Sequence, residues 1–435
     1  MRVLGVGHSC DLGDMYLRLQ EAGHEVRVFT SELAGHDTMR GMLVHVPDYR
    51  AELDWIRAAG EDGYVVFETA EHGAEQDALR RDGFFVIGGS ELGDRLENDR
   101  AFGQGVLRTA GLCTIPTHVF DDFERAIDFV RGRPRRYVFK LNGSETSSWR
   151  NFVGKAEDGA DLIALLSCQR QRLLRSELGP TRFVLMDHVE GVETGIGAYF
   201  DGRSFLRPAC LDWEHKRFFP GDLGELTGEM GTLVTYEHTE RLFAQTLAPL
   251  APMLRDGGYV GYINLNTIIN EQGIWPLELT CRFGYPGYAI LDALQLDGWP
   301  ALFRALRGRE GSFRTAGGYA IGVVLSVPPY PYRYGYAEVS RGMPVVLSSR
   351  LSAQEAQRGL HWSEVERRDG QLVTSGVIGY TVVATGVGAT VERAQQEAYA
   401  LAEQVFVPNL RYRNDIGSAF LAHGRARLRR LGYLP

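Results

Sequence analysis

The most informative segment of the chain reads Pro276-Leu277-Glu278-Leu279-Thr280-Cys281-Arg282-Phe283-Gly284. Its alternating apolar and polar residues predict a β-strand, whose period of two places Glu278, Thr280 and Arg282 on one face. A preceding strand, expected at 261–269, carries Asn264 and Asn266. Two such strands would present oxygen ligands side by side, which suits Mg2+ bridging nucleotide phosphates. Arg282 could hold a carboxylate by a two-pronged contact; a buried structural pair of Glu278 with Arg282 is the alternative interpretation.

A lysine ends the strand expected at 137–140. Lys140 follows Tyr137-Val138-Phe139 and precedes a loop of small hydroxyl residues that includes Ser144. A lysine leaving a buried strand beside such a loop can neutralise phosphate charge while the loop covers the phosphate. An ordinary surface lysine at a strand end is the alternative.

A third segment, Met186-Asp187-His188-Val189-Glu190-Gly191-Val192-Glu193, follows an apolar strand expected at 182–186. The backbone around Met186 and Val189 could bond to adenine, and Glu193 could accept hydrogen bonds from ribose hydroxyls. A solvated acidic turn is the simpler interpretation of the same residues.

A charged, glycine-punctuated stretch occupies 211–231. It contains Glu214-His215-Lys216-Arg217, then Gly221-Asp222-Leu223-Gly224 and Thr227-Gly228-Glu229-Met230-Gly231. We expect 218–231 to be a turn-rich loop, and loops this long inside a compact domain are usually functional or disordered. The glycines allow close backbone approach to a ligand, while Lys216 and Arg217 supply positive charge for phosphoryl groups.

The first hundred residues alternate strand and helix signals, which predicts a small parallel, Rossmann-like sheet. After the first strand comes Gly5-Val6-Gly7-His8-Ser9-Cys10. Such a turn offers free backbone N–H groups to an anion, although a plain tight turn explains it equally well. Cys10 stands where a dinucleotide fingerprint requires glycine, so the evidence for NAD is weak. Further along, helices are expected at 96–110, 391–406 and 425–430.

Composition limits the classes of protein that the chain can represent. With 435 residues it is long enough for two to four packed units, and its formal net charge of −8 argues against a general nucleic-acid surface. The first residues lack the basic and apolar regions of a signal peptide, and no apolar run is long enough for a membrane helix. Five scattered cysteines, without a CxxC pair, suggest neither a disulfide framework nor a zinc site. We therefore expect a cytoplasmic protein without membrane contact.

Taken in order, these pieces resemble the glycinamide ribonucleotide synthetase family of ATP-grasp ligases. The matching segments run almost from end to end of the chain. They are Glu97-Asn98-Asp99-Arg100-Ala101-Phe102, the strand ending at Lys140, Glu214-His215-Lys216-Arg217, the glycine-rich run 221–231, Cys281-Arg282-Phe283-Gly284, and Arg413-Asn414-Asp415-Ile416-Gly417.

The resemblance implies a mixed α/β and α+β chain with an ATP-grasp fold. Its parts would be an N-terminal Rossmann-like substrate domain at 1–102, a two-lobed ATP-grasp domain at 103–327 with its small lobe at about 117–190, and a C-terminal α+β domain at 328–435.

The resemblance also assigns roles to individual residues. Those expected to bind ATP are Arg100, Lys140, Ser144, Met186, Val189 and Glu193. Those expected to hold Mg2+, or Mn2+ in its place, are Glu278, Thr280 and Asn266. Those expected to act in catalysis are Arg282, Lys216 and Arg217. Those expected to contact substrate are Gly7, His8, Glu214, His215, Asp222, Thr227 and Gly228.

The implied reaction is ATP-dependent and forms ADP. A small amino acid such as glycine would be activated as an acyl phosphate and then attacked by an amine, either phosphoribosylamine or a diverged acceptor. The partners would therefore be small molecules, and the protein a monomer or homodimer. Thr280 and Asn266 are neutral where the family and many ATP-grasp enzymes offer stronger ligands, which motivates an alternative. In that reading the chain binds nucleotide in a regulatory or structural role, without ligase activity.

Overall fold

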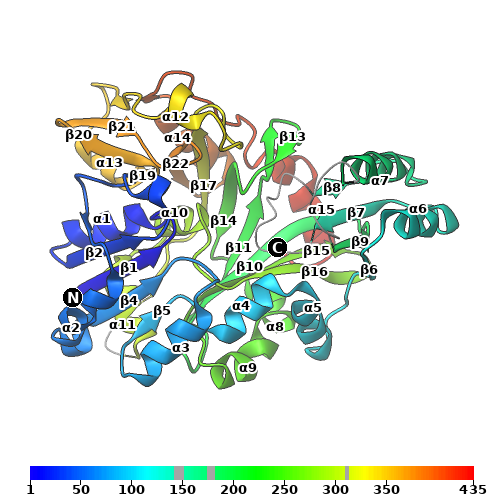
Figure 1. Cartoon of the computed structure of the whole chain (residues 1–435), viewed down its shortest axis with the longest axis horizontal. Helices are drawn as coiled ribbons and strands as arrows, with labels where there is room; N and C mark the ends of the chain where they lie inside the picture. The colour runs from blue at the N-terminus through cyan, green and yellow to red at the C-terminus, as the bar shows by residue number, and fades with distance from the viewer. Residues whose placement is uncertain (142–150, 174–181, 309–312) are drawn as a thin grey trace.

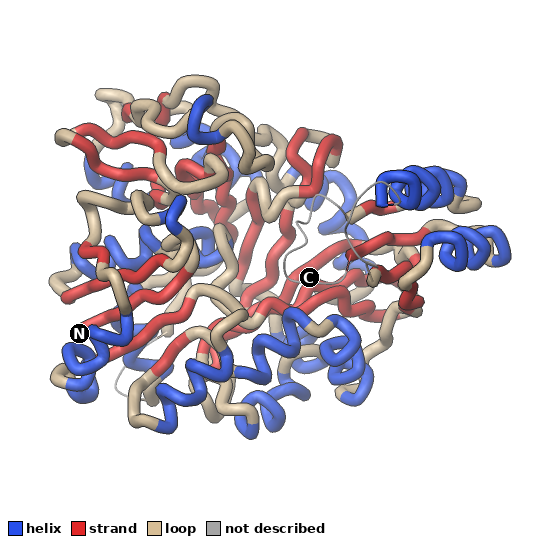
Figure 2. The backbone as a smooth tube through the Cα atoms, viewed as in Figure 1, coloured by secondary structure: helices blue, strands red, loops and turns tan. Residues whose placement is uncertain are grey.

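A computed structural model describes residues 1–141, 151–173, 182–308 and 313–435. Figure 1 shows three connected regions: an N-terminal sheet in blue, a long central sheet in green and yellow, and a small sheet from which two helices project. Figure 2 shows helices packed along the outside of these sheets.

The N-terminal sheet is parallel throughout, with strand order β3-β2-β1-β4-β5. Leu4 and Val6 of β1 pack into one buried cluster, whereas Val3 packs into the main core, so this strand is buried on both faces. The expectation of a small parallel sheet is confirmed. Its elements are β1 (Arg2–Gly7), α1 (Gly13–Glu21), β2 (Glu25–Thr30), β3 (Val44–His45), α2 (Leu53–Arg57), β4 (Gly63–Phe67), α3 (Gly73–Arg81) and β5 (Val86–Ile87).

Two helices replace the single helix expected at 96–110. They are α4 (Glu91–Asn98) and α5 (Arg100–Thr109), separated by Asp99. Asp99 has extended backbone angles, and its carboxylate accepts a hydrogen bond from the Phe102 N–H at 3.0 Å. This N-cap starts a new helix within residues 96–110, although the hydrophobic periodicity of that range suggests one continuous helix. As a result Arg100 lies at the first position of α5.

A four-stranded antiparallel sheet, ordered β6-β9-β7-β8, forms the small projecting region. The helices α6 and α7 cover one face of it, and Phe139 and Phe183 are buried between them and the strands. The elements are β6 (Thr117–Phe120), α6 (Phe123–Gly132), β7 (Tyr137–Leu141), β8 (Phe152–Val153), α7 (Ala160–Leu173) and β9 (Phe183–Asp187).

The central sheet has eight antiparallel strands in the order β16-β15-β10-β11-β14-β17-β22-β19. It runs without interruption from the region of the predicted site into the C-terminal part of the chain. The strands are β10 (Val192–Phe200), β11 (Cys210–Glu214), β14 (Gly231–Thr235), β15 (Gly261–Asn270), β16 (Gly273–Thr280), β17 (Tyr319–Ser326), β19 (Leu360–Trp362) and β22 (Tyr380–Gly388).

A short hairpin stands where a loop was expected at 218–231. It consists of β12 (Arg217–Phe219) and β13 (Leu223–Leu226), with Asp222 in the left-handed region at φ 54°. The buried Arg413 side chain fixes the hairpin, donating to the Arg217 carbonyl at 2.9 Å and to Asp222 at 3.0 Å. A loop prediction fails here because the anchoring arginine lies almost two hundred residues away in the sequence.

The helix expected at 391–406 ends earlier. It is α14 (Val391–Ala402), and the following β23 (Val405–Phe406) pairs with β18 (Val346–Leu347). Beside it, β20 (Val365–Arg368) and β21 (Gln371–Thr374) form a second small hairpin. The expected basic helix is confirmed as α15 (Arg425–Arg430).

The remaining helices are short or lie on the outside of the sheets. They are α8 (Glu240–Gln245), α9 (Ala251–Asp256), α10 (Gly287–Asp292), α11 (Gly298–Leu306), α12 (Tyr336–Val339) and α13 (Ala353–Gly359). Within the described ranges, no helix combines the length and apolar character needed to cross a membrane.

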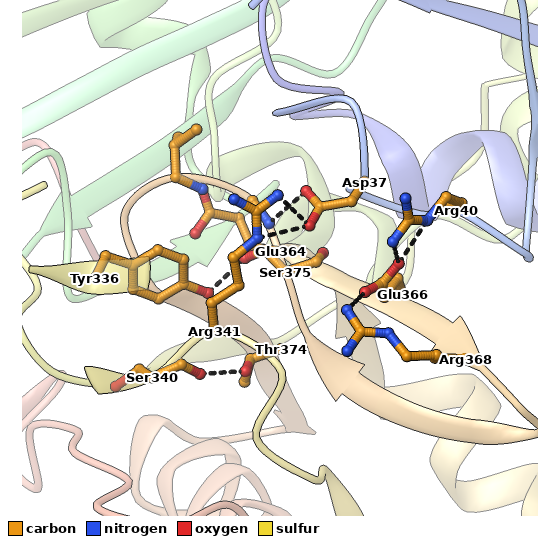
Figure 3. A network of polar contacts seen from close by, with 12 residues as sticks. Asp37, Arg40, Tyr336, Ser340, Arg341, Glu364, Glu366, Arg368, Thr374 and Ser375 are labelled. Carbon is orange, nitrogen blue, oxygen red and sulfur yellow. Dashed lines mark hydrogen bonds and ion pairs between the residues drawn. The ribbon is translucent and has the colours of Figure 1, made fainter. Parts of the chain in front are cut away.

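Ion pairs join the N-terminal sheet region to the C-terminal region (Figure 3). Asp37 accepts hydrogen bonds from Arg341, at 2.8 Å from its Nε, and from the Gly376 N–H at 3.1 Å. Arg40 donates to Glu366 at 2.7 Å. Because Asp37 is only 3% exposed, this contact is part of a packed interface and not a surface pair.

Candidate active site

Three basic side chains converge on the carboxylate of Glu278. Lys216 Nζ lies 3.3 Å from its Oε1, and Lys140 Nζ and the Arg100 guanidinium lie 3.6 and 3.5 Å from its Oε2. The four residues come from α5, β7, β16 and the segment after β11, so the fold assembles what the sequence separates. Three cations grouped around one carboxylate suit the binding of a polyphosphate together with its metal ion.

Electrostatics keep Glu278 charged. Lys140 and Lys216 hold the pKa of its carboxyl well below the usual range, against the opposing effect of burial. Burial in turn lowers the pKa of Lys140. Burial also acts to lower the pKa of Lys216, but the Glu214, Glu278 and Glu193 carboxylates outweigh it and raise the pKa well above normal.

Successive side chains of β11 and of the residues just after it point to opposite sides of the strand. Asp212, Glu214 and Lys216 line one cavity. Lys216 Nζ lies 3.0 Å from Glu214 Oε2 and 3.7 Å from Glu193 Oε1, so this lysine bridges several acids. Period-two geometry explains why alternate residues share this environment.

His215 and Arg217 lie on the opposite side of that segment. The Gly417 N–H donates to His215 Nε2 at 3.2 Å, and Arg217 donates to the Gly224 carbonyl at 2.7 Å. Both side chains therefore contact the C-terminal segment or the hairpin, and the structure separates them from the Glu278 cluster that Lys216 joins.

Residues of the glycine-rich run support the site chiefly through backbone contacts. The Thr227 N–H and hydroxyl both donate to the Lys216 carbonyl, at 2.7 and 2.9 Å. Gly228 lines the cavity, whereas Asp222 is bound to Arg413 on the hairpin. Thr227 thus holds the backbone of the lysine that contacts Glu278.

An apolar wall adjoins the small sheet. Met186 packs with Ile115 and Val184, and Val189 and Trp275 lie against them. Met186 is 2% exposed and pairs across the sheet with Val138, two residues before Lys140. Ser144 lies outside the described residues.

Arg282 lines the same cavity as Glu278 and is held by Glu97. Its Nε donates to Glu97 Oε1 at 3.0 Å, and the Cys281 N–H donates to the other carboxylate oxygen at 2.7 Å. The expected alternative, a direct pair with Glu278, is absent among the described residues; Glu97, at the end of α4, is the partner. The Glu97 carboxylate raises the pKa of Arg282, keeping it cationic.

The loop after β1 holds a separate polar group. His8 has its Nε2 2.7 Å from Glu71 and its Nδ1 2.6 Å from the Ser31 hydroxyl. Gly7 leaves room for Glu68, because a Cβ at this position would lie 2.1 Å from the Glu68 carboxylate. Gly7 and His8 therefore lie at the carboxyl end of β1, the central strand of the parallel sheet, and no contact of either with Glu278 is found among the described residues.

The cavity has a volume of about 170 Å³ and is walled mainly by polar side chains. Several of its residues were given no role from the sequence, among them Asp212, Glu229 and Tyr285. The alternation that links Asp212 with Glu214 and Lys216 was a usable signal. Glu229 lies in the glycine-rich run already singled out, and Tyr285 follows the Cys281-Arg282-Phe283-Gly284 segment, but only the folded sheet shows that both reach the cavity.

Asn266 and Thr280 flank Glu278 as expected. Asn266 lies directly opposite Glu278 in the β15–β16 register, and Thr280 lies opposite Asn264. Asn266 Nδ2 donates to Glu214 at 3.2 Å. Across the described part of the chain, no three His, Cys, Asp or Glu side chains are grouped to hold a metal ion by themselves.

Two family models match the chain. Residues 98–288 match the phosphoribosylglycinamide synthetase ATP-grasp (A) domain, and residues 320–419 match the C domain of the same synthetase. Together they span well over half of the sequence, and they include the Glu278 cluster.

Individual relatives agree with these matches. A phosphoribosylamine–glycine ligase from Vibrio cholerae is 28% identical over 364 residues, 81% of each chain. One from Pasteurella multocida is 29% identical over 354 residues, 78% of this chain and 79% of the relative.

Solved structures resemble the whole chain. The crystal structure of a phosphoribosylamine–glycine ligase from Thermotoga maritima matches with a TM-score of 0.71 and 23% identity, covering 96% of this chain and all of that one. A biotin carboxylase from Campylobacter jejuni matches with a TM-score of 0.61 and 11% identity, over 97% of this chain and 95% of that one. The likeness confirms the expected ATP-grasp fold.

Proposed function

Because the chain belongs to the phosphoribosylglycinamide synthetase family of ATP-grasp ligases, we propose that it is an ATP-dependent, ADP-forming ligase joining an amino acid to an amine. The observation that carries this proposal is the convergence of Arg100, Lys140 and Lys216 on Glu278.

The nucleotide would lie between the small sheet and the central sheet. Lys140 and Arg100 would bind its phosphates, and the apolar wall at Met186 and Val189 would receive the adenine. Glu193, whose side chain is 47% exposed, is available to ribose hydroxyls. Fixed cations stabilise charge that develops during phosphoryl transfer without reorganising in the reaction.

Magnesium is the implied metal, with Mn2+ as its substitute, and Glu278, Asn266 and Thr280 would hold it. The donor set fits: Mg2+ in nucleotide sites is usually bound by one or two carboxylates, with phosphates and water as its other ligands. When bound, the ion would neutralise phosphate charge and orient the phosphates.

Arg282 would bind the carboxylate of the amino acid, with Glu97 fixing the guanidinium in place. A carboxylate oxygen then attacks the γ-phosphorus, the bond to the β–γ bridging oxygen breaks, and ADP leaves with that electron pair. The amine nitrogen next attacks the acyl carbon, inorganic phosphate leaves, and the nitrogen loses a proton. The chain contributes positioning and charge stabilisation to both steps.

Phosphoribosylamine is the acceptor named for the relatives, and it is our first candidate here. The acceptor would approach from the loop at Gly7 and His8. Lys216 is placed to stabilise the transferring phosphoryl group, whereas Glu214, Thr227 and Gly228 would contact the amino acid or support its contacts. We assign His215, Arg217 and Asp222 to positioning the hairpin and the C-terminal segment. A cytoplasmic location and a monomeric or dimeric state remain predictions.

The test separates carboxylate activation from acceptor choice. Purified protein is incubated with Mg-ATP, a panel of amino acids and hydroxylamine, which traps an acyl phosphate as a hydroxamate. We expect ADP and hydroxamate in equal amounts. Arg282→Ala should raise KM for the amino acid at least tenfold while changing KM for ATP much less. No ADP with any carboxylate, from folded protein that binds ATP, would favour the nucleotide-binding role without ligase activity.

A further inference from the structure

The turn that follows β21 presents a row of backbone donors that is already filled. The consecutive N–H groups from Val377 to Tyr380 all donate to the carboxylate of Glu364, at 2.5 to 3.2 Å. The N–H before them, on Gly376, donates to Asp37 at 3.1 Å. Both carboxylates belong to the network drawn in Figure 3. Successive N–H groups in a turn form an anion-binding concavity, and here the chain's own carboxylates occupy it.

The loop after β1 is filled in the same way. The Asp11 N–H donates to Glu68 Oε2 at 2.8 Å, and the Leu12 N–H also bonds to this carboxyl. Gly7 makes this approach possible, because a Cβ at that position would meet the Glu68 side chain. Glu68 and Glu364 are 3% and 6% exposed, so both belong to the packed interior and differ from surface side chains that swing aside.

Both filled places lie near Arg282. Burial raises the pKa of Asp11, and the Arg282 guanidinium opposes the rise. Burial also raises the pKa of Glu364 to about 7, and the Asp11 charge adds to the rise. Tyr285 lines the cavity together with Arg282, and its hydroxyl donates to Ser363, the residue before Glu364. The amine of the acceptor must reach an acyl group held at Arg282, so the rest of the acceptor must lie against these residues.

The cations of this region are paired as well. Three cations act most strongly on Asp11, and each contacts a carboxylate; the pairs are His8–Glu71, Arg282–Glu97 and Arg333–Glu32. Arg341 is bonded to Asp37 at 2.8 Å. A phosphate monoester carries a charge of roughly −1.5 to −2 at neutral pH and is bound by N–H groups or cations. The donors and cations named here are already committed to the protein's own acids.

We propose that the amine acceptor carries no phosphate or other strongly anionic group. Glu68 and Glu364 determine this specificity, because they hold the N–H groups that would bind a phosphate. Phosphoribosylamine, the first candidate taken from the relatives, is then a poor acceptor, and a neutral or cationic amine takes its place. This inference rests on the proposed ligase function and changes only its acceptor.

The first test compares matched amines with the full chain. Protein, Mg-ATP and glycine are incubated with ribosylamine or phosphoribosylamine, each formed from ammonia and the corresponding sugar, with ammonia alone as the blank. Ethanolamine and phosphoethanolamine form a second pair. We expect the phosphate-free member of each reactive pair to give an equal or higher kcat/KM for amide formation. A kcat/KM for phosphoribosylamine tenfold or more above that for ribosylamine would overturn the proposal.

Binding of unreactive sugars decides the question if none of these amines reacts. Ribose 5-phosphate and ribose are titrated calorimetrically into protein saturated with Mg2+, a non-hydrolysable ATP analogue and glycine. We expect the two Kd values to lie within tenfold of each other, or neither sugar to bind. Ribose 5-phosphate binding more than tenfold tighter than ribose would show an open phosphate site and overturn the proposal.

Variants that free the N–H groups test the assigned residues. Glu364→Ala should bind ribose 5-phosphate at least tenfold more tightly than wild type does, because the N–H groups of the turn lose their acceptor. Glu68→Ala replaces it if Glu364→Ala does not fold. No gain in the folded variant would contradict the assignment.

A matched control comes from the small projecting region. Asp161 accepts hydrogen bonds from three N–H groups, those of Lys155, Ala156 and Leu162. Asp161→Ala therefore frees a comparable set of donors away from the turn at 376–380, and it should leave the binding of ribose 5-phosphate unchanged. An equal gain in Asp161→Ala and Glu364→Ala would mean that any freed N–H group binds the phosphate, which would overturn the role of Glu364.

The hydroxamate assay separates failure of this inference from failure of the ligase function. Hydroxylamine carries no phosphate, so hydroxamate formed from glycine supports the ligase whatever the matched amines show. Hydroxamate formation together with a tenfold preference for phosphoribosylamine would refute this inference alone. No ADP and no hydroxamate, with tighter binding of ribose 5-phosphate in Glu364→Ala, would refute the ligase while supporting the filled anion site.

Discussion

Glu278 is the residue on which the candidate site depends most directly. Glu278→Gln keeps the shape of the side chain but removes the charge that Lys140 and Lys216 face. We expect ATP turnover to fall by about a thousandfold or more, as happens when a transition-state contact worth roughly 4 kcal/mol is lost. ADP release measured beside thermal unfolding checks this. Glu157→Gln, at a side chain that is 88% exposed, should change neither; unaltered turnover in Glu278→Gln would remove Glu278 from the site.

Glu68, beneath the loop at Gly7, makes stability depend on pH. Burial, with the nearby Asp11 charge, raises its pKa to about 8, so the folded protein keeps a proton that the unfolded chain releases above its ordinary pKa near 4.5. Stability from this group is complete below that ordinary pKa and is lost as the pH rises through the folded value, by at most about 1.4 kcal/mol per pH unit.

Glu68→Gln should therefore flatten the fall in stability between pH 5 and 8, since the amide imitates the protonated acid and can still accept from the Asp11 N–H. Urea unfolding at several pH values, with Glu157→Gln as the reference, measures the difference. A parallel pH profile in wild type and Glu68→Gln would mean that Glu68 is ionised in the folded state.

The sequence predicted some residues of the candidate site and not others. Lys140, Lys216 and Glu278 were identified because each lies in a recognisable local pattern, and the structure brings them together. The role of Glu97 was missed because its partners, Cys281 and Arg282, are distant in the chain. Glu229 was given no role because only the folded sheet brings it to the cavity.

At the level of elements, strand patterns predicted the parallel N-terminal sheet and the neighbouring strands β15 and β16, because buried strands are short apolar runs, whereas β14 and β17 of the central sheet were not predicted. Boundaries set by side-chain capping or remote anchors were predicted poorly. The break at Asp99 and the hairpin held by Arg413 are the examples. Both features matter functionally. The helix break at Asp99 sets the position of Arg100, and the hairpin held by Arg413 sets the position of the segment after Lys216.

Helix α5 offers a matched pair of glycines. A Cβ on Gly103 would lie 2.7 Å from the Leu96 carbonyl, whereas one on Gly105 would meet nothing within 4 Å. We expect Gly103→Ala to destabilise by about 1–3 kcal/mol through crowding. Gly105→Ala should stabilise by up to about 1 kcal/mol, because alanine favours helix. Urea midpoints of the two variants check the sign; equal shifts would contradict the close approach of α4 to α5.

At the level of the whole molecule, the contacts in Figure 3 connect regions three hundred residues apart. Asp37→Asn leaves Arg341 and the Gly376 N–H without their anionic acceptor. We expect a loss of roughly 1–3 kcal/mol, seen by calorimetry as a lower melting temperature and a separate transition of the N-terminal sheet.

A second pair supplies the control. Glu32 and Arg333 also join the two regions, at 2.8 Å, but their side chains are 32% and 63% exposed. Glu32→Gln should therefore cost at most about 1 kcal/mol. If both variants melted alike, the buried contact at Asp37 would have no special role in holding the regions together.

The central sheet constrains how this chain can be recombined with its relatives. Strand β17 pairs with β14 on one side and with β22 on the other. The C-terminal region therefore contributes strands to the same sheet that lines the cavity. Cutting the chain after Ser326 would leave β17 as an eight-residue apolar edge, the kind of surface that seeds aggregation. The N-terminal sheet, whose five strands are hydrogen-bonded only to one another, is the better candidate for transplantation. Chimeras that exchange acceptor recognition should therefore be joined before α5, and not within the shared sheet.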